Sequence, residues 1–148
     1  MGNLGKAIAI VARIYADRVY GEDRRPYLLH CLNVMHHVSP LPDEHKRIAA
    51  VLHAAVEESQ ISLGELEAEG FVPEVVEALR VLPRHSGESA VECAKRVCSN
   101  HIARAVKISD VAVHMNEDHL GGSAMNTAER LEYAEVTSIL FSSARNAP

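Results

Sequence analysis

Residues 43–58, DEHKRIAAVLHAAVEE, form the stretch of sequence that decides the fold class. Apolar side chains recur in it at intervals of three and four residues, which is the spacing of one face of an α-helix. His53 is a polar residue within this apolar stretch. The side chains expected to point into a core are Ile48, Val51, Leu52, Ala55 and Val56. A helix with so wide an apolar face requires other elements to cover it.

The rest of the chain carries the same helical spacing. No run of alternating apolar and polar residues is present, and the chain contains only 8 Gly and 6 Pro. The sequence therefore predicts an all-α fold with about seven to eight helices. They are expected at about Leu4–Tyr15, Pro26–Val38 and Asp43–Glu58, from Ser62, at Glu74–Val81, from Ser89, at Ile102–Met115 and at Thr127–Ser143.

Capping residues place several helix starts. Ser62 and Ser89 each stand three residues before a glutamate, which is the S-x-x-E box of a helix N-terminus. Asn100 suits an N-cap, because its side chain can accept a hydrogen bond from an unpaired backbone N–H. Each of these three residues is therefore expected just before a helix.

Proline and glycine place other boundaries. Residues 39–42, Ser-Pro-Leu-Pro, are expected to end a helix, since proline disfavours the α conformation in the residue before it. Pro73 suits the first turn of a helix, where its missing N–H is not needed. Residues 121–123, Gly-Gly-Ser, predict a loop.

Length, composition and charge limit the function classes. The chain has 148 residues, of which 47% are hydrophobic and 24% charged, so one globular domain over residues 1–148 is expected. The formal net charge of −5 argues against a nucleic-acid polymer as a partner. No apolar run approaches the roughly 18 residues of a membrane span, and the N-terminus lacks a cleavable signal pattern. We therefore expect a cytoplasmic protein with no membrane partner.

Cysteine usage indicates no disulfide framework. Cys31, Cys93 and Cys98 are odd in number and are never spaced as C-x-x-C, so buried free thiols are predicted. The chain contains 9 His, a residue type that serves as metal ligand and as proton carrier near neutral pH.

Three polar residues stand in separate apolar helices: His30, His53 and Asp110. Two imidazoles and one carboxylate can bind a single divalent metal and leave positions for water and substrate. Glu57 lies one turn after His53, and Glu58 lies about 100° further round the helix, so a carboxylate is available to take a proton from an attacking water. Taken singly, a histidine on an apolar helix face also fits a core residue with a satisfied hydrogen bond.

Four segments resemble, in order, the motifs of HD-domain metal-dependent phosphohydrolases. They are PYLLH (26–30), LHAAVEES (52–59), GFVPEVVEALRVLPR (70–84) and KISDVAVHMN (107–116). The resemblance is to the RelA/SpoT-type alarmone hydrolases and their small stand-alone relatives. It implies an all-α, HD-domain-like bundle that hydrolyses a phosphorylated nucleotide.

The resemblance implies a metal site with one ligand missing. His30, His53 and Asp110 match the family's ligands, whereas Ala54 stands where the family has an aspartate. Mn²⁺ is the ion implied first, with Zn²⁺ or Fe²⁺ as alternatives, and the loss of a carboxylate is expected to weaken or abolish binding. Glu58 lies one turn after Ala54, so we expect its longer side chain to be able to lean toward the vacated space.

The resemblance also implies roles for residues around the metal. Glu57 and Glu58 match the pair that positions and activates the attacking water, and Lys107 matches a lysine near the substrate phosphates, where it would stabilise charge on the transferring phosphate. Asn116 matches an asparagine near the phosphates and ribose. His114 fits either a contact to Asp110 or substrate, or a partly exposed helix histidine.

A shorter segment replaces one family motif. The resemblance places Arg24 and Arg25, within residues 16–27, where related enzymes hold the nucleotide base. Two arginines before a helix also fit a solvated charged turn.

Two functions follow from the resemblance. The first is metal-dependent hydrolysis of a small phosphorylated nucleotide, of the guanosine tetraphosphate (ppGpp) type, at a 3′-phosphoester or pyrophosphate bond. The alternative is a catalytically degenerate HD domain that acts as a nucleotide-binding or interaction module, and Ala54 favours it. A symmetric homodimer is a reasonable expectation for a small domain of this kind.

Overall fold

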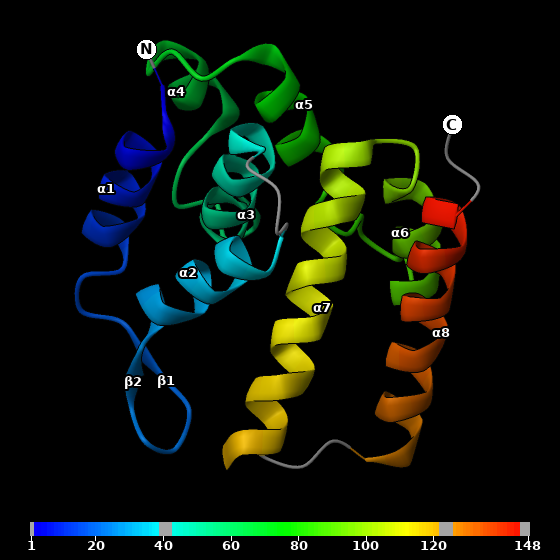
Figure 1. The fold of residues 1–148 in the computed structure, drawn as a ribbon. Helices are drawn as coiled ribbons and strands as arrows, with labels where there is room; N and C mark the ends of the chain where they lie inside the picture. Colours follow the sequence, from blue (N-terminus) through cyan, green and yellow to red (C-terminus); the bar gives the residue numbers. More distant parts are fainter. Residues whose placement is uncertain (1, 39–42, 122–125, 146–148) are drawn as a thin grey trace.

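The computed structural model describes residues 2–38, 43–121 and 126–145, with backbone only for residues 117–121 and 143–145. Within these ranges the chain forms eight helices and one short hairpin, which confirms the expected all-α class (Figure 1). The elements are α1 Leu4–Ile14, β1 Val19–Tyr20, β2 Arg25–Pro26, α2 Tyr27–His37, α3 Glu44–Glu57, α4 Leu63–Ala68, α5 Pro73–Val81, α6 Ala90–Val97, α7 His101–Gly121 and α8 Thr127–Arg145.

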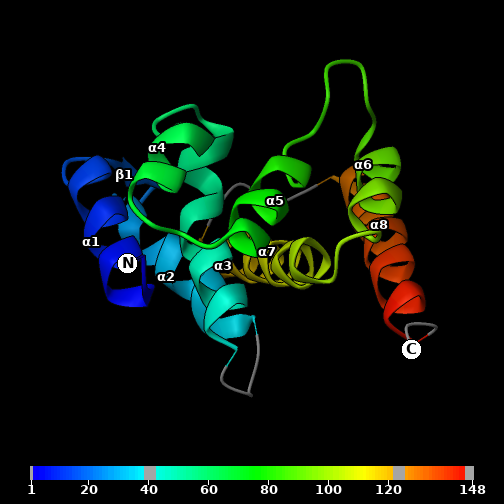
Figure 2. The ribbon, with the colours of Figure 1, turned by 90° about the horizontal axis from the view of Figure 1, so that it is seen from above.

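Helix α3 is the centre of the fold. It packs against α1, α2, α5 and α7, and the two views show it enclosed by them (Figures 1 and 2). Every residue from Ile48 to Ala55 is buried, so the helix is covered on all sides and not along one stripe only. A polar side chain in this stretch must find a partner inside the protein, because an unpaired buried polar group is costly.

The structure confirms the predicted N-cap residues and the position of Pro73. The hydroxyls of Ser62 and Ser89 each accept a hydrogen bond of 3.0 Å from the backbone N–H three residues later. The Asn100 side chain accepts a hydrogen bond of 2.9 Å from the N–H of Ala103, and Pro73 is the first residue of α5. The proline turn at residues 39–42 lies outside the described residues.

The hairpin and the end of α7 differ from the sequence expectation. Strands β1 and β2 pair antiparallel across a turn in which Gly21 and Arg24 have φ of 76° and 54°. Two-residue strands are too short to show an alternating pattern. Helix α7 continues to Gly121, so residue 121 is helical and not part of a loop; residues 122–125 lie outside the described residues.

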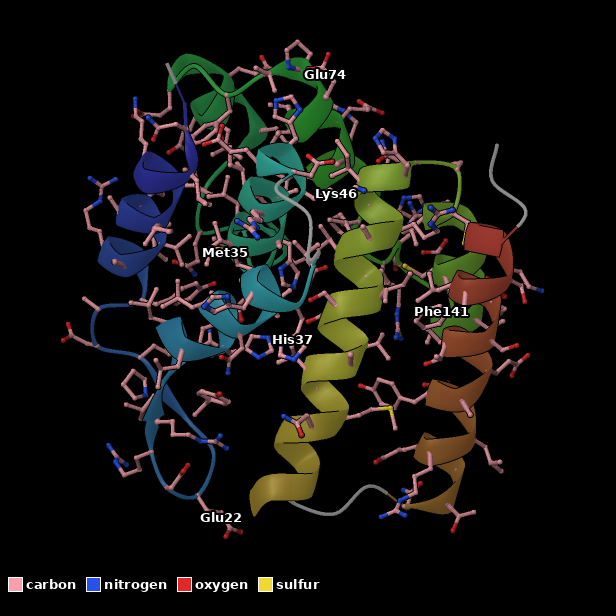
Figure 3. The ribbon with its side chains drawn as sticks, in the orientation of Figure 1. Glu22, Met35, His37, Lys46, Glu74 and Phe141 are labelled. Atoms are coloured by element: carbon pink, nitrogen blue, oxygen red, sulfur yellow. The ribbon has the colours of Figure 1, made fainter. Side chains whose placement is uncertain are left out.

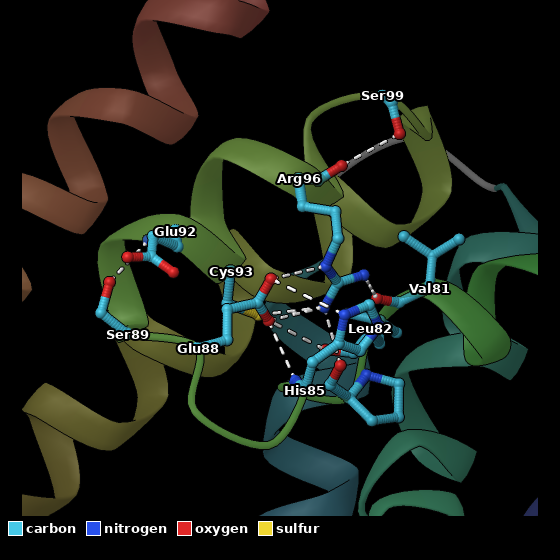
Figure 4. A network of polar contacts seen from close by, with 10 residues as sticks. Val81, Leu82, His85, Glu88, Ser89, Glu92, Cys93, Arg96 and Ser99 are labelled. Atoms are coloured by element: carbon cyan, nitrogen blue, oxygen red, sulfur yellow. Dashed lines mark hydrogen bonds and ion pairs between the residues drawn. The ribbon is translucent and has the colours of Figure 1, made fainter.

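Two polar contacts join the elements that carry the site. The Ser109 hydroxyl on α7 donates a hydrogen bond of 2.6 Å to the carbonyl of Val34 on α2. Arg96 on α6 donates to the carbonyls of Val81 and Pro83 and to the Glu88 carboxylate, which ties the α5–α6 connection to α6 (Figure 4). The second contact fixes the backbone on either side of Arg84, which reaches the site described below.

The cysteines and the described helices meet the remaining expectations in part. All three thiols are free; Cys31 and Cys93 are buried, whereas Cys98 is half-buried. No helix in residues 2–38, 43–121 or 126–145 is long and apolar enough to cross a membrane.

Candidate functional site

The His53 imidazole is buried and its orientation is fixed at both ends. Nδ1 lies 2.6 Å from the Ala50 carbonyl oxygen, one turn back along α3, so Nδ1 carries the proton that is donated there. Nε2 then faces Asp110 of α7, 3.3 Å from Oδ1. A histidine held through Nδ1 in this way presents Nε2 as a ligand or as a hydrogen-bonding group.

Asp110 joins two helices at this point. Its Oδ1 lies 3.7 Å from Nε2 of His30 on α2 as well as 3.3 Å from His53, and 24% of its side chain is exposed. Helices α2, α3 and α7 pack against one another and thereby bring together three residues that are far apart in the sequence.

The electrostatics of this group follow from its burial and contacts. Burial opposes the charge on Asp110, but hydrogen bonds from His30 and His53 outweigh it and hold the pKa of the carboxyl well below its usual value. Burial likewise opposes the charge on His53, but the Asp110 hydrogen bond and negative charge raise the His53 pKa to about 9. Without a metal, the carboxylate and the imidazoles therefore satisfy one another.

Whether this group fits a divalent metal depends on its donors. Among the residues that the structure describes, no three His, Cys, Asp or Glu side chains are grouped so as to hold a metal ion as they stand. The donor chemistry nevertheless fits, since two imidazole nitrogens and a carboxylate are a common set for Zn²⁺, Mn²⁺ or Fe²⁺. The distances of 3.3 and 3.7 Å are close to the about 3.3–3.6 Å between neighbouring donors around a tetrahedral ion. A metal would replace the hydrogen bonds of Asp110.

Ala54 contributes no donor to the group. It follows His53 on α3 and is 4% exposed, so its methyl group lies in the protein interior. A carboxylate at this position would be buried beside His53.

Glu57 and Lys107 lie at the edge of the group. Glu57 as a whole residue is exposed, yet protein atoms around its carboxyl raise its pKa, while the charges of His53 and Lys107 act in the opposite direction. A carboxyl with a raised pKa beside a metal-type donor set is a better proton acceptor than one with the usual pKa.

The Glu58 carboxylate contacts two residues from outside α3. Its Oε1 accepts hydrogen bonds of 2.5 Å from the Tyr15 hydroxyl and from Arg18 Nη1. Burial opposes the charge on Glu58, but these two hydrogen bonds and the Arg18 charge lower its pKa. The carboxylate that was expected to be able to compensate for the missing aspartate is therefore bound by residues of the segment after α1.

A cavity of about 180 Å³ opens beside Asp110. Its walls include Arg84 and Lys107, which bring positive charge, and the rings of His114 and Tyr133, which stack with centroids 5.6 Å apart. The remaining lining residues are Ala90, Val111, Glu132 and Val136. Two cations and a flat aromatic face next to a carboxylate suit a phosphorylated ligand that carries a ring.

The other predicted substrate residues lie elsewhere. Asn116 is exposed and does not line the cavity. Arg24 lies in the hairpin turn, and Arg25 is the first residue of β2. Arg25 pairs with Asp23 at 2.9 Å, and its guanidinium lies 5.1 Å from the Tyr20 ring centroid. Of the predicted substrate residues, Lys107 and His114 therefore line the cavity at Asp110, whereas Arg24 and Arg25 do not.

Three further histidines, His36, His37 and His45, are exposed. His37 Nδ1 donates to the Asn33 carbonyl on its own helix (Figure 3).

Sequence reasoning missed Arg84, Tyr133, Arg18 and Tyr15. Arg84 ends the quoted segment 70–84, and this position was the one signal available for it. Tyr133, Arg18 and Tyr15 are placed by contacts between segments that are far apart in the sequence.

Comparisons with known proteins bear on the fold. No family model matches the sequence, and a search of the curated proteins finds no match. A solved structure of a metazoan ortholog of SpoT superposes on this chain with a TM-score of 0.77 and 20% sequence identity, covering 95% of this chain and 86% of that chain. The two chains share a fold. That protein is described as hydrolysing ppGpp and as having a role in starvation responses. The resemblance to HD-domain alarmone hydrolases is thereby confirmed at the level of the fold.

Proposed function

We propose that this protein is a divalent-metal-dependent phosphohydrolase that acts on a small phosphorylated nucleotide of the ppGpp type. The observation that carries the proposal is the position of Asp110: its carboxylate contacts His30 and His53 from two other helices, and it lines a cavity together with Arg84 and Lys107. Metal donors and phosphate-binding cations side by side are what hydrolysis of a phosphate ester needs.

The metal belongs to the proposal, with Mn²⁺ as the first choice. His30 and His53 would hold it through Nε2, and Asp110 through its carboxylate. A divalent ion there supplies Lewis acidity for the attack of water on phosphorus. The Nδ1 hydrogen bond to Ala50 keeps His53 in the tautomer that binds metal.

The protein's own side chains have separate roles. Glu57 accepts the proton of the attacking water, because its carboxyl has a raised pKa and lies near His53. Glu58 belongs to the same pair in the proposal, but its carboxylate faces Arg18 and Tyr15. Lys107 and Arg84 bind the phosphate oxygens and stabilise negative charge as the phosphorus–oxygen bond breaks.

The substrate class rests on the cavity and on the structural neighbour. The stacked His114 and Tyr133 rings offer a flat face for a base or ribose, and the neighbour acts on ppGpp. Arg84 and Lys107 also offer two cationic groups in the cavity wall, which suit the phosphate groups of such a ligand. Cytoplasmic location and a homodimer remain part of the proposal.

A degenerate nucleotide-binding module is the second candidate. Two observations favour it: Ala54 supplies no ligand, and the Glu58 carboxylate is engaged by Arg18. In that case the cavity binds a nucleotide without turnover.

Phosphate release from ppGpp tests the choice. The purified protein is incubated with ppGpp and Mn²⁺, and pyrophosphate and inorganic phosphate are measured, with EDTA as the metal-free arm. The proposal predicts release that EDTA abolishes and that Lys107→Met reduces by about tenfold or more, whereas Lys95→Met, at an exposed site on α6, has no effect. Binding of ppGpp without any release favours the degenerate module, and neither binding nor release contradicts both.

A further inference from the structure

The Glu58 carboxylate is held by a small cluster outside the donor set. Tyr15, the C-cap residue of α1, and Arg18, three residues later, both donate to Oε1 at 2.5 Å. Tyr15 is 3% exposed, so its hydroxyl is a fixed donor. Together they are the two partners that the structure records for this carboxylate.

Arg18 is itself fixed, although 43% of its side chain is exposed. Its guanidinium lies 4.0 Å from the centroid of the Tyr27 ring and 5.3 Å from that of Tyr15. The two rings contact each other edge to face, with centroids 4.8 Å apart. Cation–π contacts and a charge-assisted hydrogen bond therefore keep the guanidinium next to Glu58.

Glu58 nevertheless lies one helical turn from Ala54, the position that supplies no metal ligand in this chain. It is the C-cap residue of α3, and its backbone N–H donates to the Ala54 carbonyl at 2.9 Å. Side chains of a helix point back toward its N-terminus, which is the direction of Ala54. The positive charge of His30 also acts on the Glu58 carboxylate, although the contacts of that carboxylate are with Tyr15 and Arg18.

We propose that Arg18 and Tyr15 are positioning residues that hold Glu58 away from the metal donors, and that releasing Glu58 supplies the carboxylate that Ala54 lacks. The inference rests on the proposed metal site. A carboxylate that no longer pairs with Arg18 can bind another cation. A divalent cation beside His30 and Asp110 would bind it most strongly. The weak site of the natural chain is therefore a consequence of this restraint as well as of Ala54.

Metal titration of matched variants tests the inference. Co²⁺ is added to the wild type and to Arg18→Gln; the visible absorption reports the ligands around Co²⁺, and calorimetry gives the affinity. We expect Arg18→Gln to bind Co²⁺ about fivefold to tenfold more tightly than the wild type, from the loss of one ion pair and its hydrogen bond. Arg18→Lys keeps the charge and is expected to show a smaller gain. Arg13→Gln removes a charge from an exposed site at the end of α1 and is expected to change nothing.

The double variant identifies the carboxylate. Arg18→Gln with Glu58→Gln must lose the gain in affinity and the change in absorption, because no carboxylate is left to release. Equal affinity in wild type and Arg18→Gln overturns the inference, whatever the wild type binds, and so does a gain that survives Glu58→Gln. The affinity of the wild type alone tests the proposed metal site, so the two claims fail separately.

Discussion

Nε2 of His53 lies 3.3 Å from Oδ1 of Asp110, although the two residues come from different helices. This contact ties the centre of α3 to α7, and the second contact of Asp110, to His30, adds α2. In the metal-free protein the pair forms a buried polar interaction. In the proposed enzyme the same two side chains are ligands of the metal. The same residues therefore serve stability and function.

Asp110→Asn is expected to destabilise the metal-free protein by about 1–3 kcal/mol, because it leaves the buried His53 without its charged acceptor. Urea unfolding at pH 7 measures the change. Asp17→Asn, at an exposed site after α1, is the matched control. Equal unfolding midpoints for Asp110→Asn and the wild type would show that the contact adds nothing to stability.

Ala54→Asp is expected to raise the affinity for Mn²⁺ by about tenfold or more, since it adds an anionic donor beside His53. Calorimetric titration of Mn²⁺ measures it, with Ala134→Asp on the exposed face of α8 as the control for added charge. If the affinity does not rise, position 54 does not face the ion, and the claim that Ala54 marks a missing ligand is wrong.

Arg84→Gln is expected to weaken binding of ppGpp by about tenfold, because one charge-assisted contact to phosphate is lost. Binding is measured by calorimetry in EDTA, so that no turnover interferes. Arg80 lies at an exposed site on α5 and pairs with Glu77 at 3.1 Å, and Arg80→Gln should bind ppGpp as the wild type does. An unchanged affinity for Arg84→Gln would exclude the cavity beside Asp110 as the phosphate site.

The Glu88–Arg96 contact is expected to give a pH-dependent contribution to stability. Hydrogen bonds from Arg96 and from the His85 backbone N–H lower the Glu88 pKa to about 2. A lowered pKa stabilises the fold above the usual value near 4.5, and the contribution is lost as the pH falls through 2. The difference in melting temperature between wild type and Glu88→Gln should therefore be largest at pH 7 and shrink toward pH 3. A constant difference would contradict the assignment.

The helices were predictable because their signals are local. The hydroxyls of Ser62 and Ser89 cap helices through bonds to residues three positions away, and such pairs can be read from one short segment. The orientation of Glu58 could not be predicted, because Tyr15 and Arg18 belong to a segment far from it in the sequence. A helix pattern shows that Glu58 and Ala54 share a face, but it does not show which distant cation meets the carboxylate.

The candidate site was likewise predictable only in part. The order of the motifs indicated that His30, His53 and Asp110 act together, and the structure brings them into contact. The stack of Tyr133 on His114 depends on how α8 packs beside α7, and no spacing in the sequence links those two rings.

A calorimetric titration of the wild type with Mn²⁺, after EDTA treatment and buffer exchange, tests the central claim most directly. The account predicts one ion bound per chain, with an affinity that Asp110→Asn abolishes and a melting temperature that rises with Mn²⁺. Absence of binding, or binding that persists unchanged in Asp110→Asn, would contradict a metal site formed by His30, His53 and Asp110.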